Sequence, residues 1–230
     1  MAEQPKQSTP TSSQASKQGP GIKVIDRAKN ILITPKNEWP VVEKETLIPQ
    51  TILTSYILPM LSIGAIATFI GQGLIGRNLG YYGGNTASVK AGLIGALLFV
   101  ILTVVTVFIV AAAIDALAQS FSSEKNWKKS FQLAAYSLTA AYVGAIFLLF
   151  PALNIIVILC TLYSIYPLYT GIPVMKKTPV DKHVAYLAVI ILITVVAVIL
   201  VGLVQAEIVK SFNRPKYGGF NYFGNIITFR

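Results

Sequence analysis

The chain has 230 residues, of which 54% are hydrophobic and only 12% are charged. Soluble domains carry roughly 25% charged residues, so the composition excludes an ordinary soluble protein and predicts an integral membrane protein. The net charge of +10 comes from basic residues placed between apolar blocks, a pattern that indicates membrane orientation and argues against nucleic-acid binding.

The N-terminal part predicts two segments ahead of the membrane. Residues 1–21 contain no apolar core, so we expect a solvated, disordered tail and no cleavable signal peptide. In residues 22–50, apolar positions recur at helical spacing between basic residues, namely Ile22, Ile25, Ala28 or Lys29, and Leu32. This pattern predicts an amphipathic helix on the cytoplasmic membrane surface, broken at Thr34–Pro35. A soluble cap packed on the loops is the alternative, and Trp39 is expected to anchor at headgroup level.

Five apolar runs are long enough to cross a bilayer, which takes about 20 residues. They cover residues 51–74, 91–113, 131–150, 151–170 and 184–204. Residues 51–204 therefore predict an all-α integral membrane domain, a bundle of five transmembrane helices. Spans three and four have almost no residues between them, so they are expected to form a tight antiparallel hairpin. Residues 205–230 follow as an aromatic-rich tail outside the cytoplasm.

The orientation follows from the basic residues. Thirteen of the nineteen lysines and arginines lie before span one, after span two or after span four. Because cytoplasmic segments carry an excess of Lys and Arg, we expect the N-terminus in the cytoplasm and the C-terminus outside it.

Small residues on the third span predict a helix-packing seam. They recur at about four-residue spacing and comprise Ser137, Ala140, Ala141, Gly144 and Ala145. Small side chains let helix backbones approach closely in lipid. The partner helix can belong to the same chain or to a second copy, and the sequence leaves both open.

Polar residues in the apolar runs are the candidate functional groups. Asp115, near the end of span two, is expected to pair with Lys125 or Lys128, with a role in proton or ion coupling as the alternative. Tyr163 and Tyr166 lie in the helical turn that precedes Pro167, where the helix is expected to bend. The expected interface anchors after them are Tyr169, Lys176 and Lys177.

Three stretches resemble the YIP family of Ypt/Rab-interacting membrane proteins, in its prokaryotic branch. They read RAKNILITPKNEW, AAYSLTAAYVGAIFLLFP and LYSIYPLYTGIPVMKKTPVDK. The resemblance implies five membrane helices with a cytosolic N-terminus and, for eukaryotic relatives, action with Rab GTPases in vesicle trafficking. Many members have Ser-Leu-Thr-Pro where this chain has Ala140 after Thr139, so the third helix is expected to be straighter here.

These observations favour a non-enzymatic membrane scaffold or adaptor in the bacterial cytoplasmic (inner) membrane. Its expected partners are the lipid bilayer and other membrane proteins, including a second copy of the chain, and not nucleic acid. A transporter or transporter accessory subunit is the alternative. One cysteine, Cys160, and one histidine, His183, rule out an internal disulfide and a multi-histidine metal site, and no cofactor or catalytic residue is expected.

Overall fold

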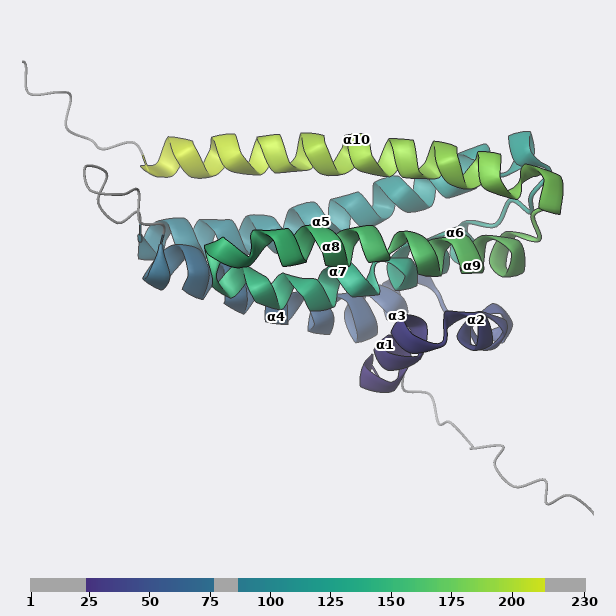
Figure 1. Ribbon diagram of the computed structural model, residues 1–230, viewed down its shortest axis with the longest axis horizontal. Helices are drawn as coiled ribbons and strands as arrows, with labels where there is room; N and C mark the ends of the chain where they lie inside the picture. Colours follow the sequence, from purple (N-terminus) through teal and green to yellow (C-terminus); the bar gives the residue numbers. More distant parts are fainter. Residues whose placement is uncertain (1–23, 77–86, 214–230) are drawn as a thin grey trace, which may run out of the picture.

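The computed structural model describes residues 24–76 and 87–213. The predicted tail over residues 1–21 and the chain beyond residue 213 lie outside these ranges. Within them, five helices are long and apolar enough to cross a membrane: Pro49–Ile75, Val89–Leu117, Trp127–Leu149, Asn154–Lys176 and Val180–Val209. The prediction of an all-α, five-span membrane protein is confirmed, and the spans lie side by side along one long axis (Figure 1).

Span one is assembled from four helical pieces. These are α3 (Pro49–Ile52), the π-helical turn η1 (Leu53–Ile57), α4 (Leu58–Ile70) and a second π-helical turn, η2 (Gly71–Ile75). Pro59 has no N–H to donate, and its ring crowds the carbonyl of the preceding turn. The wider turn η1 ends two residues before Pro59 and accommodates this.

Spans two and five are uninterrupted. Span two is α5 (Val89–Leu117), whose N-terminus is capped by the side chain of Ser88, and span five belongs to α10 (Val180–Asn213). α10 packs mainly on α5 and runs along the outside of the bundle (Figure 1). Residues 205–213 therefore continue this helix, and the expectation that the tail begins at residue 205 is wrong.

Span three is broken, contrary to the expectation of a straight helix. α6 (Trp127–Ser137) ends at Leu138, whose ψ of 4° departs from helical geometry, and α7 (Thr139–Gly144) and the 3₁₀ turn η4 (Ala145–Leu149) follow. The Thr139 hydroxyl donates to the carbonyl oxygen of Tyr136 at 2.5 Å. A side-chain hydroxyl thus occupies a backbone acceptor next to the break, and a proline is not required to interrupt the helix.

Spans three and four form the expected hairpin. Only Phe150 separates η4 from the 3₁₀ turn η5 (Pro151–Leu153), and α8 (Asn154–Tyr163) then packs on α7. The helix breaks at Ser164, three residues before Pro167, and α9 (Ile165–Lys176) follows. Span four extends to Lys176, six residues past the predicted end at Thr170.

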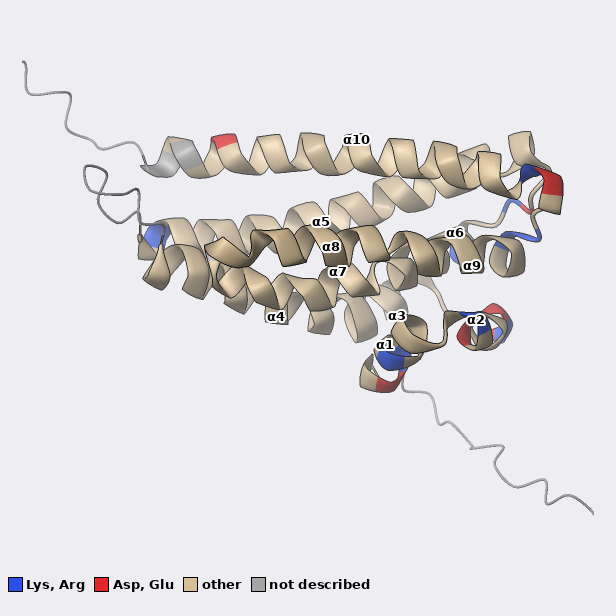
Figure 2. Ribbon diagram, in the orientation of Figure 1, with Lys and Arg blue, Asp and Glu red and all other residues tan. Residues whose placement is uncertain are grey.

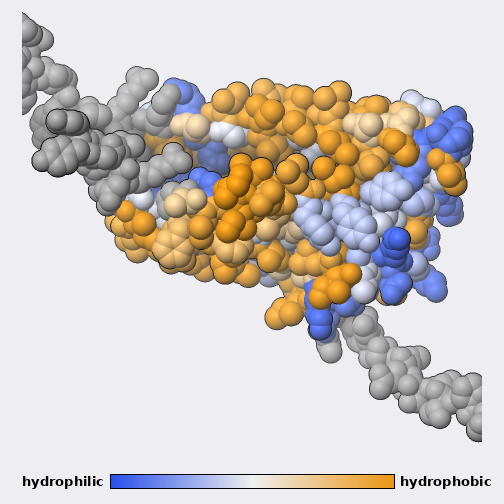
Figure 3. Space-filling model, viewed as in Figure 1, coloured by the Kyte–Doolittle hydropathy of each residue, from blue (hydrophilic) through white to orange (hydrophobic). Residues whose placement is uncertain are grey.

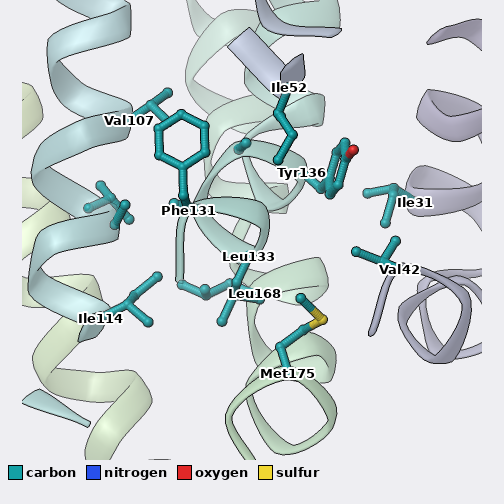
Figure 4. Close-up of a cluster of buried hydrophobic side chains, with 14 of the residues drawn as sticks. Ile31, Val42, Ile52, Val107, Ile114, Phe131, Leu133, Tyr136, Leu168 and Met175 are labelled. Carbon is teal, nitrogen blue, oxygen red and sulfur yellow. The ribbon is translucent and has the colours of Figure 1, made fainter. Parts of the chain in front are cut away.

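Two short helices precede the spans, α1 (Val24–Ile33) and α2 (Pro35–Lys44), and the chain turns between them at Thr34 as predicted. We call this pair the cap. It packs on α6, α7 and α9, so it lies on the spans themselves and not on connecting loops. Its buried side chains join the main core, where Ile31 and Val42 reach from the cap towards Tyr136 (Figure 4).

The surface separates an apolar wall from polar ends. The sides of the spans are mostly apolar, whereas hydrophilic residues gather around the cap and the adjacent connections (Figure 3). Lysine, arginine, aspartate and glutamate concentrate at that same end, the right-hand end in Figure 2. We call it the cap end of the bundle.

Candidate functional site

A buried arginine side chain connects the two helices of the cap to each other. Arg27 of α1 is only 7% exposed, and its guanidinium donates to Glu38 Oε1 at 2.5 Å and to Glu45 Oε1. Asn30 donates to the other oxygen of Glu38 at 3.0 Å, and the guanidinium lies 5.6 Å from the ring centre of Tyr136 on α6. A buried guanidinium requires such partners. The network therefore fixes α1, α2 and the start of the following connection to span three.

Two carboxylates at the edge of the cap have opposite pKa shifts. Burial raises the pKa of Glu45, although Arg27 opposes this shift. A hydrogen bond from Lys129 lowers the pKa of Glu43, and the two groups are 2.7 Å apart. The second oxygen of Glu45 is buried without a hydrogen-bond partner among the described residues. The cap is thus held partly by ionised groups whose charge depends on pH.

Trp39 docks the cap on span four. Its side chain has no exposed surface, and its indole N–H donates to the carbonyl oxygen of Pro167 at 3.0 Å and to Thr170 Oγ1 at 3.2 Å. A Cβ atom on Gly171 would lie 2.6 Å from the indole ring, so only glycine leaves room for it. The prediction of a headgroup anchor is wrong for Trp39, because α9 covers the ring that was expected to face lipid.

A second buried charge cluster joins three spans at the cap end. Ser130 of α6 donates to Asp115 Oδ1 of α5 at 3.0 Å. Lys176 of α9 donates to Ser130 Oγ at 2.7 Å, and its Nζ lies 3.6 Å from Asp115 Oδ1. Asp115 pairs with Lys176 and not with Lys125 or Lys128 as predicted. The expectation of an exposed anchor is also wrong for Lys176, whose side chain is fully buried.

Hydroxyl groups gather around the break in span three. The hydroxyls of Tyr56 and Thr139 are 2.7 Å apart, and the rings of Tyr56 and Tyr136 meet edge to face at 4.8 Å. Three further buried oxygens have no hydrogen-bond partner among the described residues: those of Tyr136, Ser137 and Tyr142. Sequence reasoning missed this cluster, although the tyrosine and hydroxyl residues flanking Leu138 signal it.

The other predicted residues lie apart from these clusters. Tyr163 donates to the carbonyl oxygen of Leu32 at 2.6 Å, and Tyr166 is in ring contact with Tyr163. Among the described residues, Asp115 has Ser130 and Lys176 as its polar partners and not these two tyrosines, so no joint site forms. Tyr169 stacks on His183 at 4.6 Å, and Lys177 pairs with Glu124 at 2.9 Å. No group of three His, Cys, Asp or Glu side chains able to hold a metal occurs within the described ranges.

The small residues of the predicted seam pack within the chain. Gly144 lies against Cys160 of α8, where an added Cβ would come within 2.4 Å of the cysteine Cβ. Ala145 lies against Gly64 of α4, and a Cβ there would be 2.7 Å from the alanine Cβ. Ser137 and Ala140 are buried, whereas Ala141 is only half-buried. The seam therefore joins span three to spans one and four.

Taken together, these polar side chains hold helices to one another. In a comparison with known protein families, the family model described as Yip1 domain matches residues 29–203. No curated protein matches the chain, and no solved structure matches it. The matched range includes Trp39, the cluster of Asp115, Ser130 and Lys176, and all but the last residues of the five spans, whereas Arg27 lies two residues before its start.

Proposed function

We propose that this chain, which belongs to the Yip1 domain family, is a non-enzymatic membrane scaffold or adaptor that binds other membrane components. The observation that carries the proposal is the docked cap. Two short helices are held against the spans by Trp39 and the Arg27 network, and their outer surface is left exposed. A rigid, preformed surface binds a partner without the entropic cost of ordering it first.

The outer surface of the cap combines apolar and basic side chains. Ile25, Ile33 and Val41 are exposed there, as are Lys29 and Lys36. The inner surface is used for packing on the spans, so the exposed side chains have no role in that contact. They are available to a partner at the membrane surface, either another membrane protein or a second copy of this chain.

Site-specific photo-crosslinking tests the proposal. A photoreactive amino acid replaces Val41 on the cap or, as the control, Val195 on α10; each valine is 46% exposed. We expect protein adducts from position 41 in native membranes, and lipid adducts without discrete protein bands from position 195. The absence of a protein adduct at position 41 argues against a scaffold that binds through its cap.

The alternative function, a transporter or transporter accessory subunit, is favoured by one observation, the pair that the buried Lys176 forms with Asp115 within the spans. Ionisable residues inside membranes often mark ion pathways. We expect the purified protein in liposomes to show no solute or proton flux, and Asp115→Asn to lower its abundance instead. A reproducible flux that Asp115→Asn abolishes would refute the scaffold and establish the alternative.

We further propose that the cap end faces the cytoplasm of a bacterial cell. The basic residues concentrated at that end support this orientation (Figure 2). With Cys160 replaced by serine, a cysteine at Lys36 should resist an impermeant thiol reagent in intact cells, whereas a cysteine at Ser211 should react. The reverse labelling pattern would invert the proposed topology.

A further inference from the structure

A groove of about 300 Å³ opens on the side of the bundle at its cap end. Three segments line it: the start of span one (Ile48 to Leu53), Phe108 of α5, and Trp127 and Lys128 at the start of α6. Phe108 lies nine residues before the end of α5 at Leu117, about 14 Å along the helix axis. The groove therefore runs from the polar cap end towards the apolar wall of the spans.

The lining residues divide into a polar rim and an apolar floor. Gln50, Trp127 and Lys128 carry N–H donors, and all three are exposed. Ile48, Leu53 and Phe108 supply the apolar surface, with the indole of Trp127 stacked 6.4 Å from the Phe108 ring. Hydrogen-bond donors and apolar side chains therefore line the same groove, a combination that matches a molecule with a polar head and an apolar chain.

The charge at the rim is positive. Lys128 has no ion pair with any described residue. No acidic residue lines the groove, and the glutamates of the neighbouring segments pair with other cations: Glu43 with Lys129, Glu45 with Arg27 and Glu124 with Lys177. An ammonium group without a carboxylate partner at the membrane surface attracts anionic lipid headgroups.

We infer that this groove is a binding site for one phospholipid with an anionic headgroup. The lipid phosphate accepts hydrogen bonds from Lys128 and from the amide of Gln50, and an acyl chain lies along Leu53 and Phe108. Trp127 spans the two regions, because its ring is apolar and its N–H is polar. The site places a bound lipid beside α6 of span three, the helix whose Tyr136 and Lys129 contact the cap.

Native mass spectrometry of the purified protein tests the inference. Protein in detergent is titrated with phosphatidylglycerol or, separately, with phosphatidylcholine, and the bound fraction is measured for wild type, Lys128→Ala and Lys125→Ala. Lys125 is exposed in the same connection but does not line the groove, so it is the matched control for charge. Melting temperatures establish that each variant is folded.

We expect one phosphatidylglycerol to bind more tightly than phosphatidylcholine. Lys128→Ala should weaken the binding of phosphatidylglycerol about five-fold, which corresponds to the attraction that one lysine contributes at a membrane surface. Lys125→Ala should leave binding unchanged, and Leu53→Trp should weaken both lipids by filling the floor. Inorganic phosphate at millimolar concentration should not displace the lipid. Equal binding of the two lipids, equal loss in both lysine variants, or displacement by phosphate alone would each overturn the inference.

Discussion

Replacing Trp39 with alanine should release the cap from the spans. The indole is fully buried against α9, and truncating a buried tryptophan costs about 3–5 kcal/mol. Most of this is lost packing, because Pro167 still accepts a hydrogen bond from Thr170 Oγ1 at 3.0 Å after the indole is removed. Since the cap is a local unit, the cost should appear as local opening and not as unfolding of the bundle.

Hydrogen exchange of the cap amides measures this opening. Each 1.4 kcal/mol is a tenfold change in an equilibrium constant, so amides of α1 and α2 should exchange about 10²- to 10⁴-fold faster in Trp39→Ala. Amides of α5 should be unaffected. The neighbouring Val41→Ala is the control, because Val41 is exposed and its truncation should leave the exchange of the cap unchanged.

A double-mutant cycle with Gly171→Ala isolates the contact. An added methyl group would lie 2.6 Å from the Trp39 ring and 2.5 Å from Leu133 Cδ1, and such overpacking costs about 1–3 kcal/mol. In the Trp39→Ala background the cost should fall, because one of the two opposing groups is absent. Strictly additive effects, or unchanged cap exchange in Trp39→Ala, would refute the docking of the cap through this ring.

Two further predictions concern the seam and the pH dependence. Gly144→Leu should lower the stability of the extracted protein by more than Ala141→Leu, because Gly144 lies against Cys160 whereas Ala141 is half-buried; equal melting temperatures of the two variants would contradict this. The hydrogen bond from Lys129 lowers the pKa of Glu43, so the pair stabilises the cap above the ordinary carboxyl pKa of about 4.3 and less as the pH falls below it. The acceleration of exchange at the cap amides in Lys129→Met relative to wild type, corrected for the intrinsic exchange rate and measured at low salt, should therefore shrink from pH 7 towards pH 4, and a constant acceleration would exclude this contribution.

Hydropathy predicted the number and order of the spans but misplaced their ends. Span four was expected to end at Thr170 because about 20 residues cross a bilayer, and Lys176 was expected beyond that end as an interface anchor. In the fold, Lys176 is buried beside Asp115, which lies on another span. A charged side chain can be buried at the end of a membrane helix when a partner distant in sequence neutralises it. A hydropathy window covers only neighbouring residues, so it cannot detect that partner.

The candidate site shows the same limit. Trp39 was expected at the lipid surface because tryptophan is common there, yet its partners are more than 120 residues away in sequence. The break at Leu138 was missed because it comes from a threonine side chain and not from a proline. By contrast, the break at Thr34–Pro35 and the close packing of Gly144 depend on local chemistry and residue size, and both could be predicted.

The separation of Trp39 from its acceptor also sets the order of events during synthesis. The indole donates to a carbonyl group 128 residues further along the chain. At translation rates of about 5–20 residues per second, that carbonyl is made about 6–26 s after Trp39. The first helices to leave the ribosome therefore cannot reach their final place until the segment of span four that holds this acceptor has been made.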